Sequence, residues 1–140
     1  MNLFIDCEWT KWNGELLSMA LVPENGTFRS FYDAIEYDVA DCDPWVVQNV
    51  LPVMDIEPVT MEVFQFRLSE YLRMFDSIHV IGDWPEDIAW FCRALITGPG
   101  MRMNTPPVTM QIIRVDAPST KPHNALADAM GIRDYLMRKQ

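Results

Sequence analysis

The sequence has few cysteines and no long apolar run, and each shortage excludes a class of protein. Its three cysteines, Cys7, Cys42 and Cys92, are odd in number and include no Cys-x-x-Cys pair. We therefore expect reduced, mostly buried thiols rather than a disulfide framework or a zinc finger. No stretch approaches the length of a membrane-spanning helix, so no membrane partner is expected. The apolar run before Glu8 is too short, and too soon followed by acids, to be a secretory signal.

Basic residues are also scarce, with 11 lysines and arginines against 20 aspartates and glutamates and a formal net charge of −9. This balance argues against a protein that coats nucleic acid electrostatically. It does not exclude a small acidic site that works through bound cations, because the cations reverse the local field. The chain also lacks a G-x-S-x-G motif, a P-loop and a paired cysteine nucleophile motif, which leaves an unrelated small α/β hydrolase without support.

What the chain does contain begins with a short apolar strand that ends in acids. Asn2 to Ile5 is typical of a buried central strand, and Asp6-Cys7-Glu8 follows it. Strand periodicity places Asp6 and Glu8 on one face and Cys7 on the other. Such carboxylates repel each other unless a cation lies between them, although acids that have already left the sheet are simply solvated. Sites form at the carboxyl ends of central strands in open α/β sheets, which favours the cation.

The rest of the chain predicts one α/β domain over residues 1–140, long enough to bury a sizeable core. Strands over 15–22 and 27–32, joined by tight turns, would complete an antiparallel meander with the first strand. An acidic loop over 33–43 and helices over 45–53 and 60–75 follow. A strand over 77–82, a helix over 88–96, a patternless loop over 97–107, a strand over 108–115 and a final helix complete the order.

A second group of polar residues follows the strand over 77–82. Asp83 lies in the loop, and Asp87 lies at the beginning of the next helix, where the backbone dipole favours an anion. A plain helix-capping role is a strong alternative for Asp87. His79 lies within the apolar strand itself, so we expect a core histidine there rather than a catalytic one.

The stretch from Pro122 to Tyr135 carries the other histidine and an aspartate five residues later. Five residues is a poor spacing for two groups on one helix face. We therefore expect His123 in the loop or first turn and Asp128 inside the helix, both aimed at one point. The small residues that surround them would let the helix approach a sheet closely. The alternative is an amphipathic helix whose histidine and aspartate are solvated.

Taken together, these motifs closely resemble those of the DEDDh 3′–5′ exonucleases, a family that includes polymerase proofreading subunits, ribonuclease T and oligoribonuclease. The first motif is matched by residues 4–8, the second by residues 80–88, and the third, H-x4-D, by residues 123–129. The chain departs from many members at Asp83, where they have Asn. The resemblance spans nearly the whole chain. The chain is shorter than most members of the family and is most similar to the compact exoribonuclease branch typified by RNase AS.

The resemblance implies a ribonuclease H-like fold, a five-stranded mixed sheet with an antiparallel N-terminal meander, then parallel strands, and helices on both faces. It also implies phosphodiester hydrolysis with two Mg²⁺ or Mn²⁺ ions, roughly 3.5–4 Å apart. Carboxylate oxygens suit such hard cations. Asp6 would bridge both ions, with Glu8, Asp87 and Asp128 as the other ligands. His123 would be the general base for the attacking water, because imidazole exchanges protons near neutral pH.

The expected function is 3′–5′ removal of nucleoside 5′-monophosphates from single-stranded ends, with RNA favoured over DNA by analogy with the compact branch. Stacking and sugar contacts would hold the terminal nucleotides, and the 2′-OH separates RNA from DNA. The candidates for contact with substrate are Trp9, Leu17, Asp83, Trp84 and Lys121. Core packing is an equal alternative for Trp9 and is favoured for Trp12.

Two other functions remain open. The chain is alternatively a DNA-directed proofreading-type exonuclease, or a non-catalytic ribonuclease H-like module that binds nucleic acid or a polymerase. An inactive relative would usually have lost one of the five motif residues, and all five are present here. The resemblance also makes a homodimer plausible and predicts a cytoplasmic protein, bacterial or phage-encoded.

Overall fold

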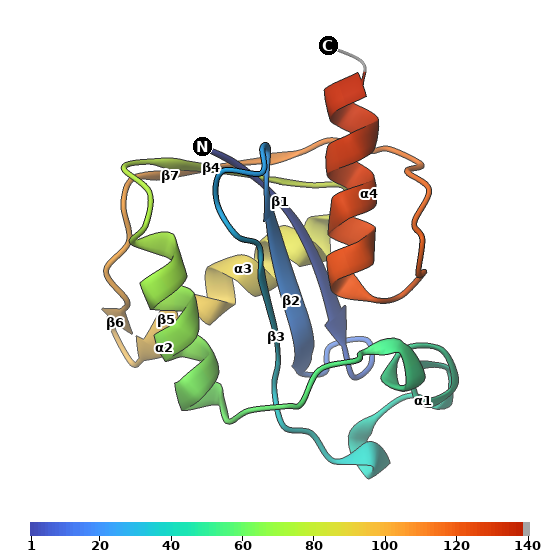
Figure 1. The fold of residues 1–140 in the computed structure, drawn as a ribbon. Helices are drawn as coiled ribbons and strands as arrows, with labels where there is room; N and C mark the ends of the chain where they lie inside the picture. Colours follow the sequence, from blue (N-terminus) through green and yellow to red (C-terminus); the bar gives the residue numbers. More distant parts are fainter. Residues whose placement is uncertain (139–140) are drawn as a thin grey trace.

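The computed structural model describes residues 1–138 and is built around a five-stranded sheet (Figure 1). The strands lie in the order β3-β2-β1-β4-β7. Their bounds are β1 Asn2–Trp9, β2 Leu16–Pro23, β3 Phe31–Ala34, β4 Ile78–Gly82 and β7 Val108–Ile112. β3 begins four residues later than expected and takes in the first two residues of the expected acidic loop.

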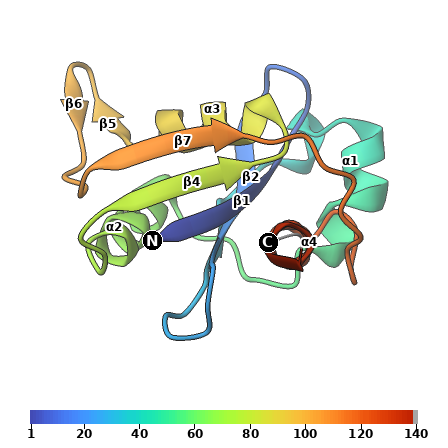
Figure 2. The same cartoon turned by 90° about the horizontal axis from the view of Figure 1, so that it is seen from above.

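The sheet is mixed, as predicted. β2 pairs antiparallel with β1 and with β3, whereas β4 pairs parallel with β1 and with β7. Figure 2 shows β1, β4 and β7 running side by side in the same direction. The carboxyl ends of these three strands therefore meet at one edge. The architecture is the expected α/β, ribonuclease H-like one.

Helices cover both faces because the strands are apolar on both sides. Leu3 and Ile5 of β1 pack in the main core under α2 Met61–Leu72 and α3 Pro85–Ala94. The opposite face of β1 and β2 carries α4 Ala125–Arg138. Figure 1 shows α2 and α4 on opposite sides of β1 and β2. The expected close approach of α4 is confirmed, since Ala125 and Ala129 are fully buried against Ala20 and Val22 of β2.

The segment between β3 and α2 forms a short helix, as expected from its prolines, and the helix ends four residues before the expected end at residue 53. A 3₁₀ turn, Val39–Asp41, precedes α1 Pro44–Asn49, and a second, Leu51–Val53, follows it. Pro52 accounts for the interruption, because a proline has no N–H to continue the helical hydrogen bonds. α1 is tied to the β1–β2 turn by a hydrogen bond from the Asp43 N–H to the Thr10 carbonyl, 2.8 Å.

Two other details differ from expectation. The loop expected over 97–107 contains a small hairpin of β5 Ile96–Gly98 and β6 Met101–Arg102, which turns at Gly100 with a φ of 67°. His79 is not a core residue, because its ring lies on the open side of β4 and hydrogen-bonds Thr109 and Gln111 of the neighbouring strand. The expectation of mostly buried thiols is also wrong, because Cys7 is buried, whereas Cys42 is half-buried and Cys92 is exposed.

None of the helices within residues 1–138 combines the length and the apolar character that crossing a membrane requires.

Candidate active site

β1 carries Asp6 and Glu8 on the face of the sheet that α4 covers. Leu3, Ile5 and Cys7 are buried in the core beneath α2 and α3, and Phe4 packs on the other face with Ile132 of α4. Alternation along the strand places Asp6 and Glu8 on the same face as Phe4. The predicted separation of the two acids from Cys7 is confirmed.

Asp87 lies in the first turn of α3 and is only 2% exposed. Its Oδ1 accepts a hydrogen bond of 3.0 Å from the backbone N–H of Cys7, on β1. The residue that precedes α3, Trp84, makes no side-chain cap. Asp87 is therefore a link between α3 and β1, and the plain capping alternative does not describe it.

His123 and Asp128 meet through the turn that precedes α4. His123 has a φ of 72°, in the left-handed region, and its backbone N–H donates to Asp128 Oδ2 at 3.1 Å. Asn124 holds the turn in place. Its Oδ1 accepts from the Ala127 N–H at the beginning of α4, and its Nδ2 donates to the Val53 carbonyl. The predicted positions of His123 before the helix and Asp128 inside it are confirmed.

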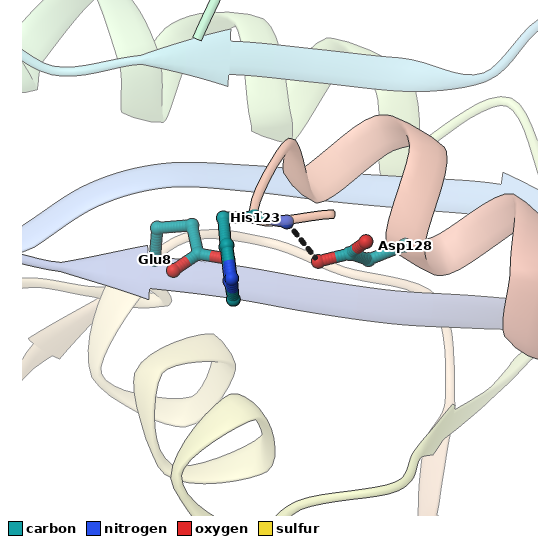
Figure 3. A group of neighbouring side chains, drawn as sticks. All are labelled: Glu8, His123 and Asp128. Atoms are coloured by element: carbon teal, nitrogen blue, oxygen red, sulfur yellow. Dashed lines mark hydrogen bonds between the residues drawn. The ribbon is translucent and has the colours of Figure 1, made fainter. Parts of the chain in front are cut away.

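The acids fall into two groups of possible metal ligands. One group joins Glu8, His123 and Asp128, and Figure 3 shows these side chains brought together from β1 and from the start of α4. The other group joins Asp6, Asp83 and Asp87. In each group the ligand atoms lie within 4.8 Å of one another. A cavity of about 280 Å³ opens beside them, lined in part by Asp6, Asp83, His123 and Asp128.

The site brings together buried carboxyl groups that raise one another's pKa values. Burial, together with the carboxylates of Asp128 and Asp87, raises the pKa of Glu8 to about 8. Burial and the nearby Asp83 also raise the pKa of Asp87 to about 8, although the Cys7 N–H opposes the shift. The pKa of Asp6 is raised well above its usual value, first by burial and then by Asp87 and Glu8. Such carboxylates are poorly stabilised as anions by the protein alone.

One buried oxygen atom of the cluster has no hydrogen-bond partner among the described residues. Asp6 as a residue is half-buried, but its Oδ2 is shielded from solvent, and no hydrogen-bond donor within residues 1–138 reaches it. A buried carboxylate oxygen without a donor is costly unless a cation coordinates it. The donor set consists of carboxylates and one imidazole, which suits a hard divalent cation such as Mg²⁺ or Mn²⁺. The residues therefore fit the expected metal ions.

The expected substrate contacts have different surroundings. Leu17 is fully buried with Val46, Val50 and Met54, so the expectation that it touches a base is wrong. The cause is a bulge: the β1–β2 register passes from Glu8 opposite Ser18 to Trp9 opposite Leu16, which leaves Leu17 as the extra residue.

Trp9 packs against the main core, and its ring lies 6.5 Å from that of Trp90, in agreement with the packing alternative. Trp84 is 46% exposed, and its indole N–H donates to Glu86. Lys121 forms an ion pair with Asp55. Asp83, expected at the edge of the substrate site, lies among the acids instead.

Two exposed tryptophans lie beside the site and are not among the predicted substrate contacts. Trp12 was expected to pack, yet it is 80% exposed, and Trp45 of α1 is 51% exposed. Both line a cavity of about 420 Å³ that also borders Glu8 and Lys11. Trp45 further contacts the His123 ring, at 4.9 Å between centroids. In the sequence, Trp45 is visible only as an apolar residue in an acidic segment, next to a proline. That signal does not predict a contact with His123, which lies far along the chain.

No known protein-family model matches the chain, and no curated protein matches it.

Proposed function

We propose that this protein is a two-metal-dependent 3′–5′ exonuclease that removes nucleoside 5′-monophosphates from single-stranded nucleic acid, with RNA favoured over DNA. The observation that carries the proposal is the buried Oδ2 of Asp6, which has no donor among the described residues and lies within a cluster of carboxylates from β1, α3 and α4. Among the described residues no lysine or arginine forms an ion pair with these acids, and a structural role alone would not gather them in this way.

The chemistry that the cluster supports is hydrolysis of a phosphodiester. Asp6, Glu8, Asp87 and Asp128 would hold the two Mg²⁺ or Mn²⁺ ions. Asp83 is an additional candidate ligand, because it shares a group with Asp6 and Asp87. The bound ions would supply an activated water and stabilise negative charge on the attacking and leaving oxygens.

His123 is the candidate general base. A ring nitrogen of His123 lies within 4.8 Å of carboxylate oxygens of Glu8 and Asp128, and the residue borders the cavity in which a water and a phosphate would sit. In the proposed reaction this nitrogen accepts the proton of the attacking water. The bond from the backbone N–H of His123 to Asp128 fixes the main chain of the turn next to this candidate ligand.

Exposed aromatic rings beside the acids support a single-stranded substrate. Trp12, Trp45 and Trp84 offer faces on which unpaired bases can stack. Lys11, which lines the same cavity as Trp12 and Trp45, is a candidate for a phosphate contact. With a net charge of −9, affinity would depend on these local contacts and the bound cations rather than on a basic surface.

A time course on 5′-labelled single-stranded RNA and DNA of one sequence tests the proposal. We expect a ladder that shortens from the 3′ end with Mg²⁺ or Mn²⁺, stops in EDTA, and is absent for Asp128→Ala. The ratio of the two rates measures the preference for RNA. Intact RNA and DNA in every metal condition would overturn the proposal, and retained binding would then favour a non-catalytic nucleic-acid-binding module.

A further inference from the structure

Trp45 and His123 form an edge-to-face pair of rings. Their centroids are 4.9 Å apart, and the ring planes meet at 80°. The two residues come from different elements, α1 and the turn before α4. Within the described residues, Trp45 is the only aromatic residue in contact with the His123 ring. No hydrogen bond to the ring is found among the same residues.

The His123 ring needs support of this kind. Its backbone lies in a left-handed turn outside α4, and the hydrogen bond to Asp128 is made by the backbone N–H rather than by the ring. The main chain of the turn is therefore fixed, while the side-chain torsions that aim the imidazole are not. A neighbouring ring that packs against the imidazole restricts those torsions.

Trp45 is itself well anchored, although its indole is half exposed. Its backbone N–H donates to the Asp43 carboxylate at 2.9 Å, and the Asp43 N–H donates to the Thr10 carbonyl in the β1–β2 turn. The next residue, Val46, packs with Leu17 of β2. These contacts fasten α1 to the strands next to Glu8, so α1 can act as a fixed support.

We propose that Trp45 is a positioning residue that holds the His123 imidazole beside Glu8 and Asp128. This inference rests on the proposed function, because it assigns the ring that Trp45 supports to proton transfer. It differs from a base-stacking role in that it acts on any phosphodiester, including one that carries no nucleobase. A displaced general base loses catalysis even when substrate still binds, since proton transfer requires hydrogen-bonding distance.

Phe66 is the control residue. It is an exposed aromatic residue of α2 that borders neither of the two cavities beside the acids, and it has no ring contact with His123 among the described residues. Bis(p-nitrophenyl) phosphate is the matched substrate, because it contains the scissile bond but no nucleobase. Loss of stacking on its aromatic rings would raise KM, whereas loss of positioning lowers kcat. We expect Trp45→Ala to lower kcat on this diester by roughly 10- to 100-fold with little change in KM. Phe66→Ala should leave both constants unchanged, and Trp45→Phe should recover most of the lost kcat.

A second readout is independent of activity. The chain has only two histidines, so His79 serves as an internal reference in NMR spectra of the ring protons. The indole shifts the His123 ring resonances, and we expect Trp45→Ala to move them while the His79 resonances stay in place. Unmoved His123 resonances, or a Trp45→Ala kcat equal to that of wild type, would overturn the positioning role. A wild type inactive on RNA, on DNA and on the diester would instead overturn the proposed function, whatever the NMR result.

Discussion

The Asp87 carboxylate accepts a hydrogen bond from the backbone N–H of Cys7, 80 positions earlier in the chain. Cys7 lies between Asp6 and Glu8, so this one bond fixes the position of α3 against the segment of β1 that carries both acids. Asp87, a predicted metal ligand, therefore also has a structural role. Substitutions at this position can separate the two roles.

Asp87→Asn and Asp87→Ala should differ in stability but not in activity. Asn keeps an oxygen that accepts from the Cys7 N–H, whereas Ala leaves that buried N–H without a partner, at a cost of about 1–3 kcal/mol. Both variants lose the negative charge, so both should lose metal-dependent cleavage. Denaturant unfolding measures the difference in stability, and the RNA time course measures the loss of cleavage. Equal unfolding free energies of the two variants would contradict the structural role of Asp87.

His123→Ala and Asp128→Asn should abolish or strongly reduce turnover and leave the fold intact. Loss of a general base commonly costs about 10²–10⁴-fold in rate. Both side chains border the cavity rather than the core, so the melting temperature should change little. The Asn variant keeps the size of Asp128 and an oxygen for the His123 N–H, which separates loss of charge from loss of shape. Wild-type rates in either variant would remove that residue from the mechanism.

The metal-free protein should become less stable as pH rises from about 4.5 to about 8. The pKa of Glu8 is raised from 4.5 to about 8 in the folded state, and that of Asp87 is raised to about 8. Between these values the folded protein keeps protons that the unfolded chain has released. Unfolding therefore releases protons, and its free energy falls as pH rises. Mg²⁺ at pH 8 should restore stability by binding only the folded state.

Melting temperatures in EDTA at pH 5 to 8.5 measure this dependence. Glu8→Gln should flatten it, because the substitution removes one of the groups that titrates. Glu57→Gln, at an exposed position between α1 and α2, removes the same charge away from the site and controls for the general repulsion of an acidic protein. A melting temperature that rises with pH in EDTA would have the wrong sign.

Gly131→Ala should destabilise the protein, although alanine is the better helix former by about 1 kcal/mol. A Cβ at Gly131 would lie 2.4 Å from the Pro118 carbonyl oxygen, so the backbone that crosses α4 must move. That segment includes Ser119, which borders the active-site cavity and whose hydroxyl opposes the rise in the pKa of Asp128. We therefore expect a lower melting temperature together with weaker Mg²⁺ binding. Gly26→Ala, where a Cβ meets no atom within 4 Å, should be neutral.

The sequence was sufficient for those parts of the site that depend on local pattern. Alternation along β1 predicted that Asp6 and Glu8 share a face, and the five-residue spacing predicted that His123 precedes the helix that carries Asp128. Both predictions are confirmed, because each depends on a few neighbouring residues. The mixed sheet followed from tight turns in the first third of the chain and from alternating strands and helices afterwards.

The misplaced residues depend on long-range packing instead. The bulge that turns Leu17 toward α1 changes the strand register at one position, which no hydrophobic pattern reveals. His79 lies on a part of the sheet that α4 does not cover, and this follows from where α4 crosses the strands rather than from β4 itself. Trp45 meets His123 only because α1 is bound to the β1–β2 turn.

The order of the cluster along the chain has a consequence during synthesis. Asp6 and Glu8 are translated before His123 and Asp128, which follow only after six further strands, β2 to β7, and three α-helices, α1 to α3. Proteins are translated from the N-terminus, so a nascent chain carries the first acids long before it carries the histidine. If the protein is the nuclease proposed here, a nascent chain stays inactive until His123 and Asp128 have been translated.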